Sequence, residues 1–512
     1  MLSAVVSLLG RLLGWLLTPI PLGVLAVTLG AVYYYLTKDY DFWPSRGVKG
    51  PRAKLPWGNE FGPPVVTDVV DFEEWIYHKQ GGKKFCGYME MHRPVLYVGD
   101  PDLIRAITVK DFEHFTDRRD LVLSDAFKEM LSVVNGKKWR DTRSVMSPTF
   151  SSSKMRLMHQ LCLDNASNLG KYMLEEMQEK GEVQMKDSFG RFTMDNIAAC
   201  AFGVNCNSFK DRNTEFATHA AALFKPPTTY GFFRFVALLT LPTWLFNKLP
   251  DPTLVINGFF SRVVNKTIAH REAKGSSRRD FLQLLLETKD KDGNRVLSNE
   301  SIVAQSVLFF IAGYDTTATL LTFAGYSLAT NPDCQRAAHR EIDDVLERYG
   351  GQMTYEAVSE MTYMDRVLNE TLRMYPPAPR LERQCSKDYI LPGTSVHIPR
   401  GTLVQMPVVI MHRDPDIYPD PLRFDPDRFL PEEKEKRHPC SYLPFGNGPR
   451  NCIAMRFALF EAKVALIAVL RENSLKPGPR TPPPPMPMNT TGFLLSPKQE
   501  ASYMKVVPRS KD

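Results

Sequence analysis

A ten-residue loop, Phe445 to Ala454, constrains the architecture of this chain more than any other segment. Its two glycines and a proline predict a tight turn, and the apolar periodicity that follows predicts a helix from about Ile453. Cys452 therefore stands just before a helix N-terminus, where the helix dipole and nearby N–H groups favour a thiolate. An isolated cysteine is more often a small buried hydrophobe, but the residues around Cys452 favour a ligand instead.

A thiolate in such a loop suits an iron porphyrin. A haem that splits dioxygen needs a proximal ligand that pushes electron density into the O–O bond, and a cysteine thiolate does so. Glycines let the backbone approach the porphyrin closely, and Arg450 can pair with a haem propionate. The sequence therefore predicts that Cys452 is the metal ligand of a haem cofactor.

The loop resembles the haem-binding loop of the cytochrome P450 family, with Phe445, Arg450 and Cys452 at the family's spacing. Ala454 occupies the last position of that pattern, where glycine is commoner in the family. The resemblance covers about residues 40–505. It implies a mainly α fold with small β-sheets, the cytochrome P450 fold, preceded in this chain by an N-terminal transmembrane helix.

A second motif, residues 312–317 (Ala-Gly-Tyr-Asp-Thr-Thr), lies in an apolar run with helical periodicity from about Ser298 to Thr330. It resembles the family's oxygen-activation helix. The resemblance implies that Thr316 and Asp315 are catalytic, Thr316 by hydrogen bonding to oxygen and Asp315 by relaying protons. The alternative is a second transmembrane helix over Ile302–Ala329, which a carboxylate at its centre makes costly.

Further residues resemble the ligands with which the family holds the haem propionates. Trp139 and Arg143 are one helical turn apart and so share a face of the helix. Arg118 and Arg383 stand in segments that match the family's segments for the same task. The resemblance implies that these residues bind the cofactor, and the alternative for each arginine is a solvated surface position.

The pair Glu370 and Arg373, three residues apart, carries little information alone. It resembles the family's Glu-x-x-Arg pair, which joins a later arginine in a buried triad. Arg428 stands at a matching distance along the chain. We expect these three residues to be structural and not catalytic.

The first segment of the chain predicts a membrane anchor. Leu12 to Leu36 carries no charge over about 25 residues, which is enough to span a bilayer. Basic residues are denser after this stretch than before it, so the positive-inside rule puts the rest of the chain in the cytoplasm. We expect residues 1–37 to be the anchor, 38–58 a hinge rich in proline, glycine and basic residues, and 59–512 the haem-thiolate monooxygenase domain. The alternative is a cleaved signal peptide, which the length of the apolar stretch disfavours.

This topology makes a prediction about glycosylation. The chain has five Asn-x-Ser/Thr sequons, which should all stay unused because glycans are added on the other side of the membrane. They begin at Asn165, Asn265, Asn299, Asn369 and Asn489.

The rest of the sequence predicts a helical body with few strands. Val, Ile and Tyr predict strands within 88–99 and 389–410, and most of 100–380 has helical periodicity. Residues 225–252 are apolar but broken by prolines, and form either a core loop or a second membrane contact. Eight cysteines without close pairs predict no disulfide framework, and a net charge of +7 without a nucleic-acid motif predicts no nucleic-acid partner.

Together these features predict a haem-thiolate monooxygenase of the endoplasmic reticulum membrane, single-pass, with its catalytic domain facing the cytoplasm. The stretch 380–470 most resembles the animal branch that includes microsomal drug-metabolising and insect detoxifying enzymes. The resemblance implies an oxidoreductase that inserts one atom of dioxygen into an apolar small molecule, such as a xenobiotic, a steroid or a fatty acid.

Electrons are expected from NADPH through a separate flavoprotein reductase, the NADPH–cytochrome reductase, because the chain has no Gly-x-Gly-x-x-Gly fingerprint of its own. Cytochrome b5 is a further expected partner. A basic cluster near the proximal motifs is expected to steer the acidic reductase; it comprises Lys137, Lys138, Arg140, Lys434, Lys436 and Arg437. Two alternatives stay open: a haem-thiolate isomerase or dehydratase that needs no reductase, and a non-catalytic haem or lipid carrier.

The resemblance also implies where the substrate pocket lies, although it does not name the substrate. Phenylalanines in the expected walls would make a large apolar cavity. These walls are the segment after Arg119, Phe232–Leu241, the residues around Phe309, Ala378–Leu381 and Thr491–Leu494.

Overall fold

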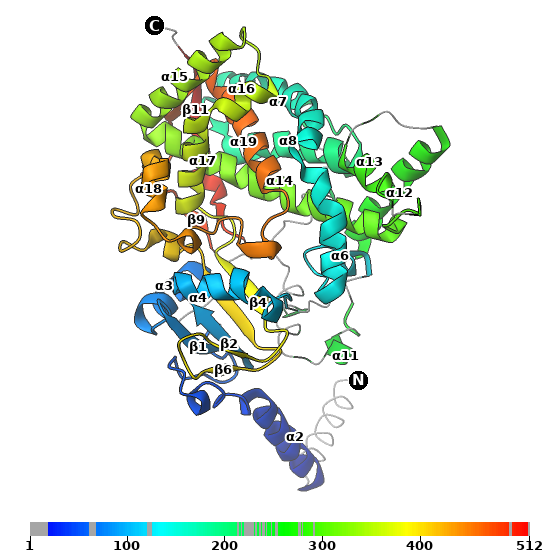
Figure 1. Ribbon diagram of the computed structural model, residues 1–512, viewed down its shortest axis with the longest axis vertical. Coiled ribbons are helices and arrows are strands. Elements are labelled where there is room, and N and C mark those ends of the chain that lie inside the picture. Colours follow the sequence, from blue (N-terminus) through cyan, green and yellow to red (C-terminus); the bar gives the residue numbers. More distant parts are fainter. Residues whose placement is uncertain are drawn as a thin grey trace, which may run out of the picture.

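The computed structural model describes residues 19–60, 68–119, 125–211, 215–216, 218–219, 230, 233–234, 237, 241, 243–246, 248–250, 254–274, 278, 280–289, 292–490 and 494–509. In this part of the chain the fold is mainly helical with small sheets, as predicted. Most helices gather in one part of the molecule, the largest sheet lies at one end of it, and the N-terminal helix projects beyond that sheet (Figure 1).

The α-helices of the described residues are α2 (Pro19–Thr37), α3 (Val69–Lys79), α4 (Pro101–Arg105), α5 (Asp125–Lys128), α6 (Gly136–Met146), α7 (Ser152–Lys180), α8 (Met185–Ile197), α11 (Thr243–Phe246), α12 (Leu254–Lys274), α13 (Phe281–Leu286), α14 (Asn299–Thr330), α15 (Pro332–Arg348), α16 (Tyr355–Glu360), α17 (Thr362–Met374), α18 (Pro431–Glu435) and α19 (Met455–Leu470). The strands are β1 (Phe85–Glu90), β2 (Arg93–Val98), β3 (Val183–Gln184), β4 (Arg380–Gln384), β5 (Tyr389–Ile390), β6 (His397–Ile398), β7 (Leu403–Pro407), β8 (Asn473–Pro477), β9 (Met488–Asn489), β10 (Ser496–Pro497) and β11 (Tyr503–Pro508).

The predicted long helix is α14, which runs through the centre of the helical part (Figure 1). Ser298 caps it by accepting a hydrogen bond from the Ser301 N–H at 3.1 Å, and Asn331 with Pro332 ends it. α14 is long and apolar enough to cross a membrane, but 61% of its most apolar window is buried inside the protein. It packs against α8, α12, α17 and α19. The alternative of a second transmembrane helix is therefore not supported, and α14 is the central core helix.

The largest sheet has the strand order β1-β2-β7-β4. The stretch 88–99, where we expected strand, is part of a hairpin, because Met91 adopts a positive φ of 56° and turns the chain between β1 and β2. β7 runs parallel to β2 and antiparallel to β4. Alternation along β4 puts Leu381 and Arg383 on one face, and Arg380 and Glu382 on the other. This alternation positions Arg383 for the site described below.

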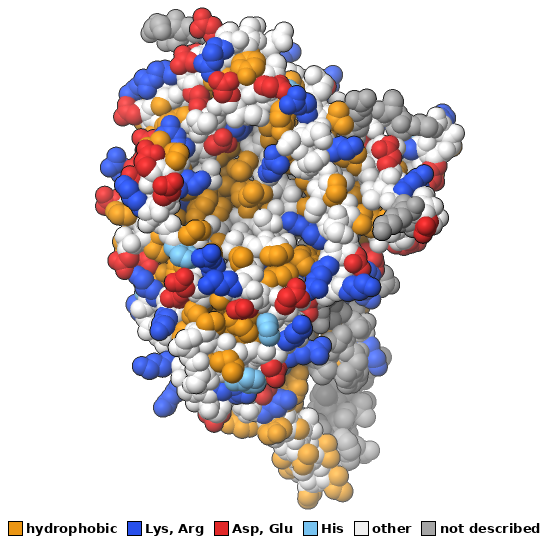
Figure 2. Space-filling model, in the orientation of Figure 1, with side chains coloured by type: hydrophobic (Ala, Val, Ile, Leu, Met, Phe, Trp, Pro, Cys, Tyr) orange, Lys and Arg blue, Asp and Glu red, His pale blue; other side chains and the backbone are white. Residues whose placement is uncertain are grey.

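The N-terminal helix α2 carries exposed apolar side chains along its described length. Ile20 is 79% exposed and Val27 is 74% exposed, although both are fully apolar. In Figure 2 this helix protrudes from the body, with hydrophobic side chains (orange) between the white backbone atoms. The apolar part of the described helix, Leu22–Thr37, is too short by itself to count as a membrane span, and residues 1–18 of the predicted anchor lie outside the described residues.

Candidate functional site

The glycine-rich loop is a tight turn, as predicted, and one glycine in it is indispensable. Gly448 has a positive φ of 68°, and a β-carbon there would lie 1.8 Å from the Thr108 carbonyl oxygen. The Asn447 amide donates a 2.9 Å hydrogen bond to the Thr108 hydroxyl, which ties the loop to the same segment. A short 3₁₀ turn, Gly448–Arg450, follows, and α19 begins at Met455, two residues later than predicted. Only glycine, which has no β-carbon, can bring position 448 this close to the Thr108 carbonyl.

Cys452 joins the two ends of the glycine-rich loop. Its backbone N–H donates to the Phe445 carbonyl at 2.8 Å, which closes the loop. The Cys452 side chain is exposed although protein surrounds it on nearly all sides. Burial raises the pKa of its thiol, while the Ala454 N–H and the charges of Arg143 and Arg118 lower it. The predicted helix-end effect is therefore present, but burial outweighs it in the net direction of the pKa.

Three arginines from other segments bond the backbone of this loop, and the fourth, Arg450, belongs to the loop itself. Arg143 donates to the Asn451 carbonyl at 2.8 Å, and Arg118 donates to the Arg450 carbonyl at 3.4 Å. Arg383 donates to the Asn447 carbonyl at 3.4 Å. The structure thus brings together all four arginines that the sequence predicted, from segments as far apart in the chain as residues 118 and 450.

The guanidinium of Arg450 itself points into the protein. It donates to the Thr116 carbonyl at 2.7 Å and the Val134 carbonyl at 2.9 Å. Its charged carbon lies 4.4 Å from the centre of the Trp139 ring. Trp139 is buried and also packs on Phe112, with ring centres 5.5 Å apart. The Trp139 ring therefore stabilises the Arg450 guanidinium through a cation–π contact.

The arginine cluster has positive charge that no ion pair of the described residues neutralises, and the carboxylates of Asp117 and Glu382 act on it only from further away. Within the described part of the chain, no carboxylate lies at ion-pair distance from Arg118, Arg143, Arg383 or Arg450. Burial, together with repulsion from Arg118 and Arg450, lowers the pKa of Arg383 to about 9. Burial and repulsion from Arg118 likewise lower the pKa of Arg450 to about 9. Nε of Arg383 and one terminal nitrogen of Arg450 are buried without hydrogen-bond partners. The cluster fits a ligand that carries carboxylates, which the haem propionates are.

The central helix contributes the other predicted residues. Ala312 is exposed in the middle of α14, and the residues beside it, 311 and 313–316, are half-buried. Thr316 is half-buried and donates its hydroxyl to the Ala312 carbonyl one turn earlier. Asp315 forms an ion pair with Lys186 of α8, with Oδ1 and Nζ 2.8 Å apart. The predicted pair Asp315–Thr316 is thus split between two faces of the helix.

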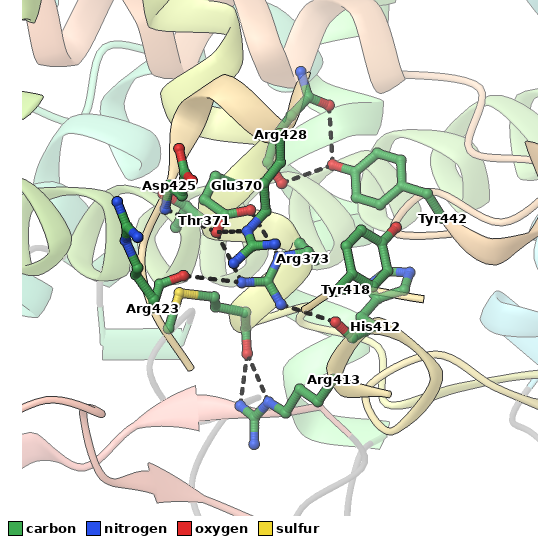
Figure 3. A network of polar contacts seen from close by, with 12 residues as sticks. Glu370, Thr371, Arg373, His412, Arg413, Tyr418, Arg423, Asp425, Arg428 and Tyr442 are labelled. Carbon is green, nitrogen blue, oxygen red and sulfur yellow. Dashed lines mark hydrogen bonds and ion pairs between the residues drawn. The ribbon is translucent and has the colours of Figure 1, made fainter. Parts of the chain in front are cut away.

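The predicted structural triad is present and buried (Figure 3). Arg373 holds Glu370 through two hydrogen bonds of 2.7 and 2.8 Å, and both side chains are 0% exposed. Nε of Arg428 lies 3.5 Å from a Glu370 oxygen. Arg373 also donates to the His412 carbonyl at 2.9 Å. These residues join α17 to the chain that leads into the glycine-rich loop.

Sequence analysis missed several residues of the site. Nε2 of His412 accepts a 2.8 Å hydrogen bond from the Leu443 N–H, just before the loop. Burial and then Arg373 lower the pKa of His412 to about 3, so this ring is neutral and can accept. Asn135 accepts from the Arg118 N–H at 2.9 Å and from the Arg450 guanidinium at 3.0 Å. None of these side chains, nor Lys186, has a local sequence signal, because their partners are distant in the chain.

Two expectations about surfaces are only partly met. Phe309 is buried against the rings of Phe150, Phe281 and other apolar residues, so it belongs to the core and not to a pocket wall. In the basic cluster, Lys138 pairs with Glu129, Arg140 with Glu113, and Lys436 with Glu433. The predicted pocket walls at 120–124 and 491–493, and most of 225–252, lie outside the described residues.

Comparisons with known proteins agree with this geometry. The family model of cytochrome P450 matches residues 73–502. Cytochrome P450 9e2 of Blattella germanica is 36% identical, over 91% of this chain and 93% of its own length. Cytochrome P450 3A29 of Sus scrofa is 36% identical, over 95% of this chain and 96% of its own length. Probable cytochrome P450 6a13 of Drosophila melanogaster is 36% identical, over 94% and 98%. The chain belongs to the cytochrome P450 family, whose members are haem-thiolate oxidoreductases.

Proposed function

We propose that this protein is a membrane-anchored haem-thiolate monooxygenase that oxidises apolar small molecules with electrons from NADPH. The observation that carries the proposal is the unneutralised arginine cluster around an exposed cysteine inside the protein. Cationic groups are rarely buried without a carboxylate at ion-pair distance, because the desolvation of each charge is costly. A ligand that carries two carboxylates and an iron atom would neutralise the arginines and bind the cysteine sulfur.

In this proposal Cys452 holds the iron, and Arg118, Arg143 and Arg383 hold the propionates. Arg450 and Trp139 stabilise the loop through their cation–π contact, and the Phe445 carbonyl closes it by accepting from the Cys452 N–H. When bound, haem supplies the redox chemistry that activates dioxygen. The protein's own tasks are to place an apolar substrate, to exclude water and to deliver protons.

We assign proton delivery to Thr316 and Asp315 of α14. The Thr316 hydroxyl, which donates to the Ala312 carbonyl, can turn to donate to another acceptor beside the exposed Ala312. Asp315 is one residue earlier and bears a carboxylate that can take up a proton and pass it on. An intact acid and hydroxyl at these positions favour the monooxygenase over an isomerase or a carrier.

The proposed domain order is an anchor over 1–37, a hinge over 38–58 and the haem domain over 59–512. The exposed apolar side chains of α2 support the anchor, because such a surface is costly in water. We place the protein in the endoplasmic reticulum membrane with its haem domain in the cytoplasm. Deleting residues 1–37 should move the protein from the membrane fraction to the salt-washed supernatant. Glycan on any of the five sequons would contradict the orientation.

The proposed electron donor is an NADPH-dependent flavoprotein reductase, with cytochrome b5 as a second partner. Lys137 and Lys434 are exposed, and no carboxylate of the described residues lies at ion-pair distance from either. Changing Lys137 and Lys138 to Glu should lower reductase-supported turnover and spare peroxide-supported turnover, because charge steers the encounter and not the chemistry. Lys274→Glu, at the end of α12, is the control. Equal loss of both activities would contradict the docking site.

One experiment separates the proposed activity from its alternatives. Purified protein is incubated with the reductase, NADPH, ¹⁸O₂ and a panel of steroids, fatty acids and xenobiotics, and the products are identified by mass. A monooxygenase gives NADPH-dependent products that carry one ¹⁸O atom. A product that forms without NADPH and without label would indicate an isomerase or dehydratase, and binding without product would indicate a carrier.

A further inference from the structure

The segment 116–118 joins the parts of the chain that carry the arginine cluster. Its Asp117 carbonyl accepts from the Gln384 N–H at 2.8 Å, which ties the segment to the end of β4. The Arg450 guanidinium donates to the Thr116 carbonyl at 2.7 Å, which ties the segment to the glycine-rich loop. The start of α6 is also bonded to this segment, and side chains make that contact.

Asn135, the residue before α6, makes this contact with its side-chain amide. Its Oδ1 accepts from the Arg118 N–H at 2.9 Å, and its Nδ2 donates to the Arg118 carbonyl at 2.9 Å. The same Oδ1 accepts from the Arg450 guanidinium at 3.0 Å. An amide can make all three bonds because it has both a donor and an acceptor. One side chain thus fixes the backbone of one arginine and the guanidinium of another.

The side chain of Asn135 does not perform the usual task of its position. Its backbone angles (φ −120°, ψ 169°) make it the N-cap of α6, and an N-cap asparagine normally accepts from an N–H of the first helical turn. Within α6, all of whose residues the structure describes, no N–H caps onto this side chain. The Gly136 N–H donates instead to Oδ1 of Asp117 at 2.8 Å. The asparagine at the capping position therefore holds the two arginines.

The charge of the side chain at position 135 matters as well as its shape. Aspartate is as good an N-cap as asparagine, and its carboxylate could accept the same two hydrogen bonds. A carboxylate there would lie at ion-pair distance from Arg450, since Oδ1 of Asn135 is 3.0 Å from that guanidinium. The amide oxygen holds the same guanidinium and leaves its charge in place.

We propose that Asn135 is a positioning residue of the cofactor site, which holds Arg118 and Arg450 in place and leaves their positive charge available to the carboxylates of haem. It acts through these two arginines. Ordering long side chains before the cofactor binds lowers the entropy that binding costs. This inference rests on the proposed haem site and adds to it the neutral residue that orders the arginines.

The first test measures the rate of haem transfer from the holoprotein to apomyoglobin. Asn135→Ala removes all three hydrogen bonds and should speed transfer about tenfold, the value of one hydrogen bond to a charged group. Asn135→Asp keeps the accepting positions but adds a carboxylate beside Arg450, and it should transfer haem at least as fast as Asn135→Ala. Asn168→Asp, at an exposed position of α7, is the control and should behave like the wild type. Wild-type transfer in Asn135→Ala, or slower transfer in Asn135→Asp than in Asn135→Ala, would overturn the proposal.

The second test measures the reduction potential of the haem iron, which reports charge and not packing alone. Asn135→Asp should have a more negative potential than the wild type and Asn135→Ala, because a carboxylate beside the arginines disfavours electron uptake. Asn135→Ser, which keeps a short polar group without charge, should stay near the wild type. Equal potentials in Asn135→Asp and Asn168→Asp would overturn the proposal. A wild type without the spectrum of thiolate-ligated haem would refute the proposed function, whereas a normal wild type with unaffected Asn135 variants would refute only this inference.

Discussion

Removing Arg373 should destabilise the protein strongly, because it would leave a buried carboxylate without its main partner. Arg373→Met deletes two hydrogen bonds to Glu370, of 2.7 and 2.8 Å, and one of 2.9 Å to the His412 carbonyl. The remaining partners of Glu370 are the Asp425 N–H at 3.0 Å and Arg428 at 3.5 Å. Breaking a buried ion pair on one side costs about 3–5 kcal/mol. We expect a loss of that size.

The comparison variants separate charge from packing. Replacing both partners, in Glu370→Leu/Arg373→Met, removes the unpaired charge and should recover part of the loss. The unbonded His412 carbonyl and Asp425 N–H should still cost about 1–3 kcal/mol each. Arg366→Met is the control on the same helix, because its 2.6 Å pair with Asp427 is partly exposed and should contribute at most about 1 kcal/mol.

Urea unfolding of the haem protein, followed by circular dichroism and by the haem spectrum together, gives these free energies. The His412–Leu443 hydrogen bond links the triad to the glycine-rich loop, so haem release should shift to lower urea in Arg373→Met as well. A loss below about 1 kcal/mol, equal to that of the Arg366→Met control, would refute the reasoning.

Three further predictions concern pH, the loop and cofactor binding. Burial raises the pKa of Glu461 to about 8. Between pH 4.5 and 8 the folded protein therefore keeps a proton that the unfolded chain loses. The contribution of this group to the free energy of unfolding is complete below pH 4.5 and is lost as the pH rises to 8. Glu461→Gln should remove that decline when urea midpoints are measured between these pH values, and parallel pH profiles would contradict it. Gly448→Ala should abolish haem-loaded protein, because its β-carbon would meet the Thr108 carbonyl at 1.8 Å; normal haem content per polypeptide would disprove this. Arg383→Met should speed haem transfer to apomyoglobin about tenfold, the value of one charge-assisted hydrogen bond, while the exposed Arg400→Met should not; equal rates would argue against propionate binding.

Local patterns predicted the parts of the site whose geometry is local. The glycines and proline around Cys452 forced the turn, and the apolar run from about Ser298 predicted the start of α14 to within one residue. Arg118, Arg143 and Arg383 were found through resemblance, because no rule of spacing brings residues 118 and 450 together.

The rest depends on contacts between distant segments. Lys186 and His412 contact residues more than 25 positions away, so nothing in their own neighbourhood marks them. Phe309 was expected in a pocket wall, but the phase of α14 turns it towards Phe150 and Phe281. The net rise in the pKa of the Cys452 thiol also needed the folded structure, because burial is a property of the whole fold.

Ligation of haem iron by the sulfur of Cys452 is the central claim, and one spectrum tests it most directly. The purified protein is reduced and saturated with carbon monoxide, and its Soret band is compared with that of Cys452→Ala. We predict the strongly red-shifted maximum of thiolate-ligated haem in the wild type and its loss in the variant. An unshifted band in the wild type, or a red-shifted band that survives in Cys452→Ala, would contradict the account.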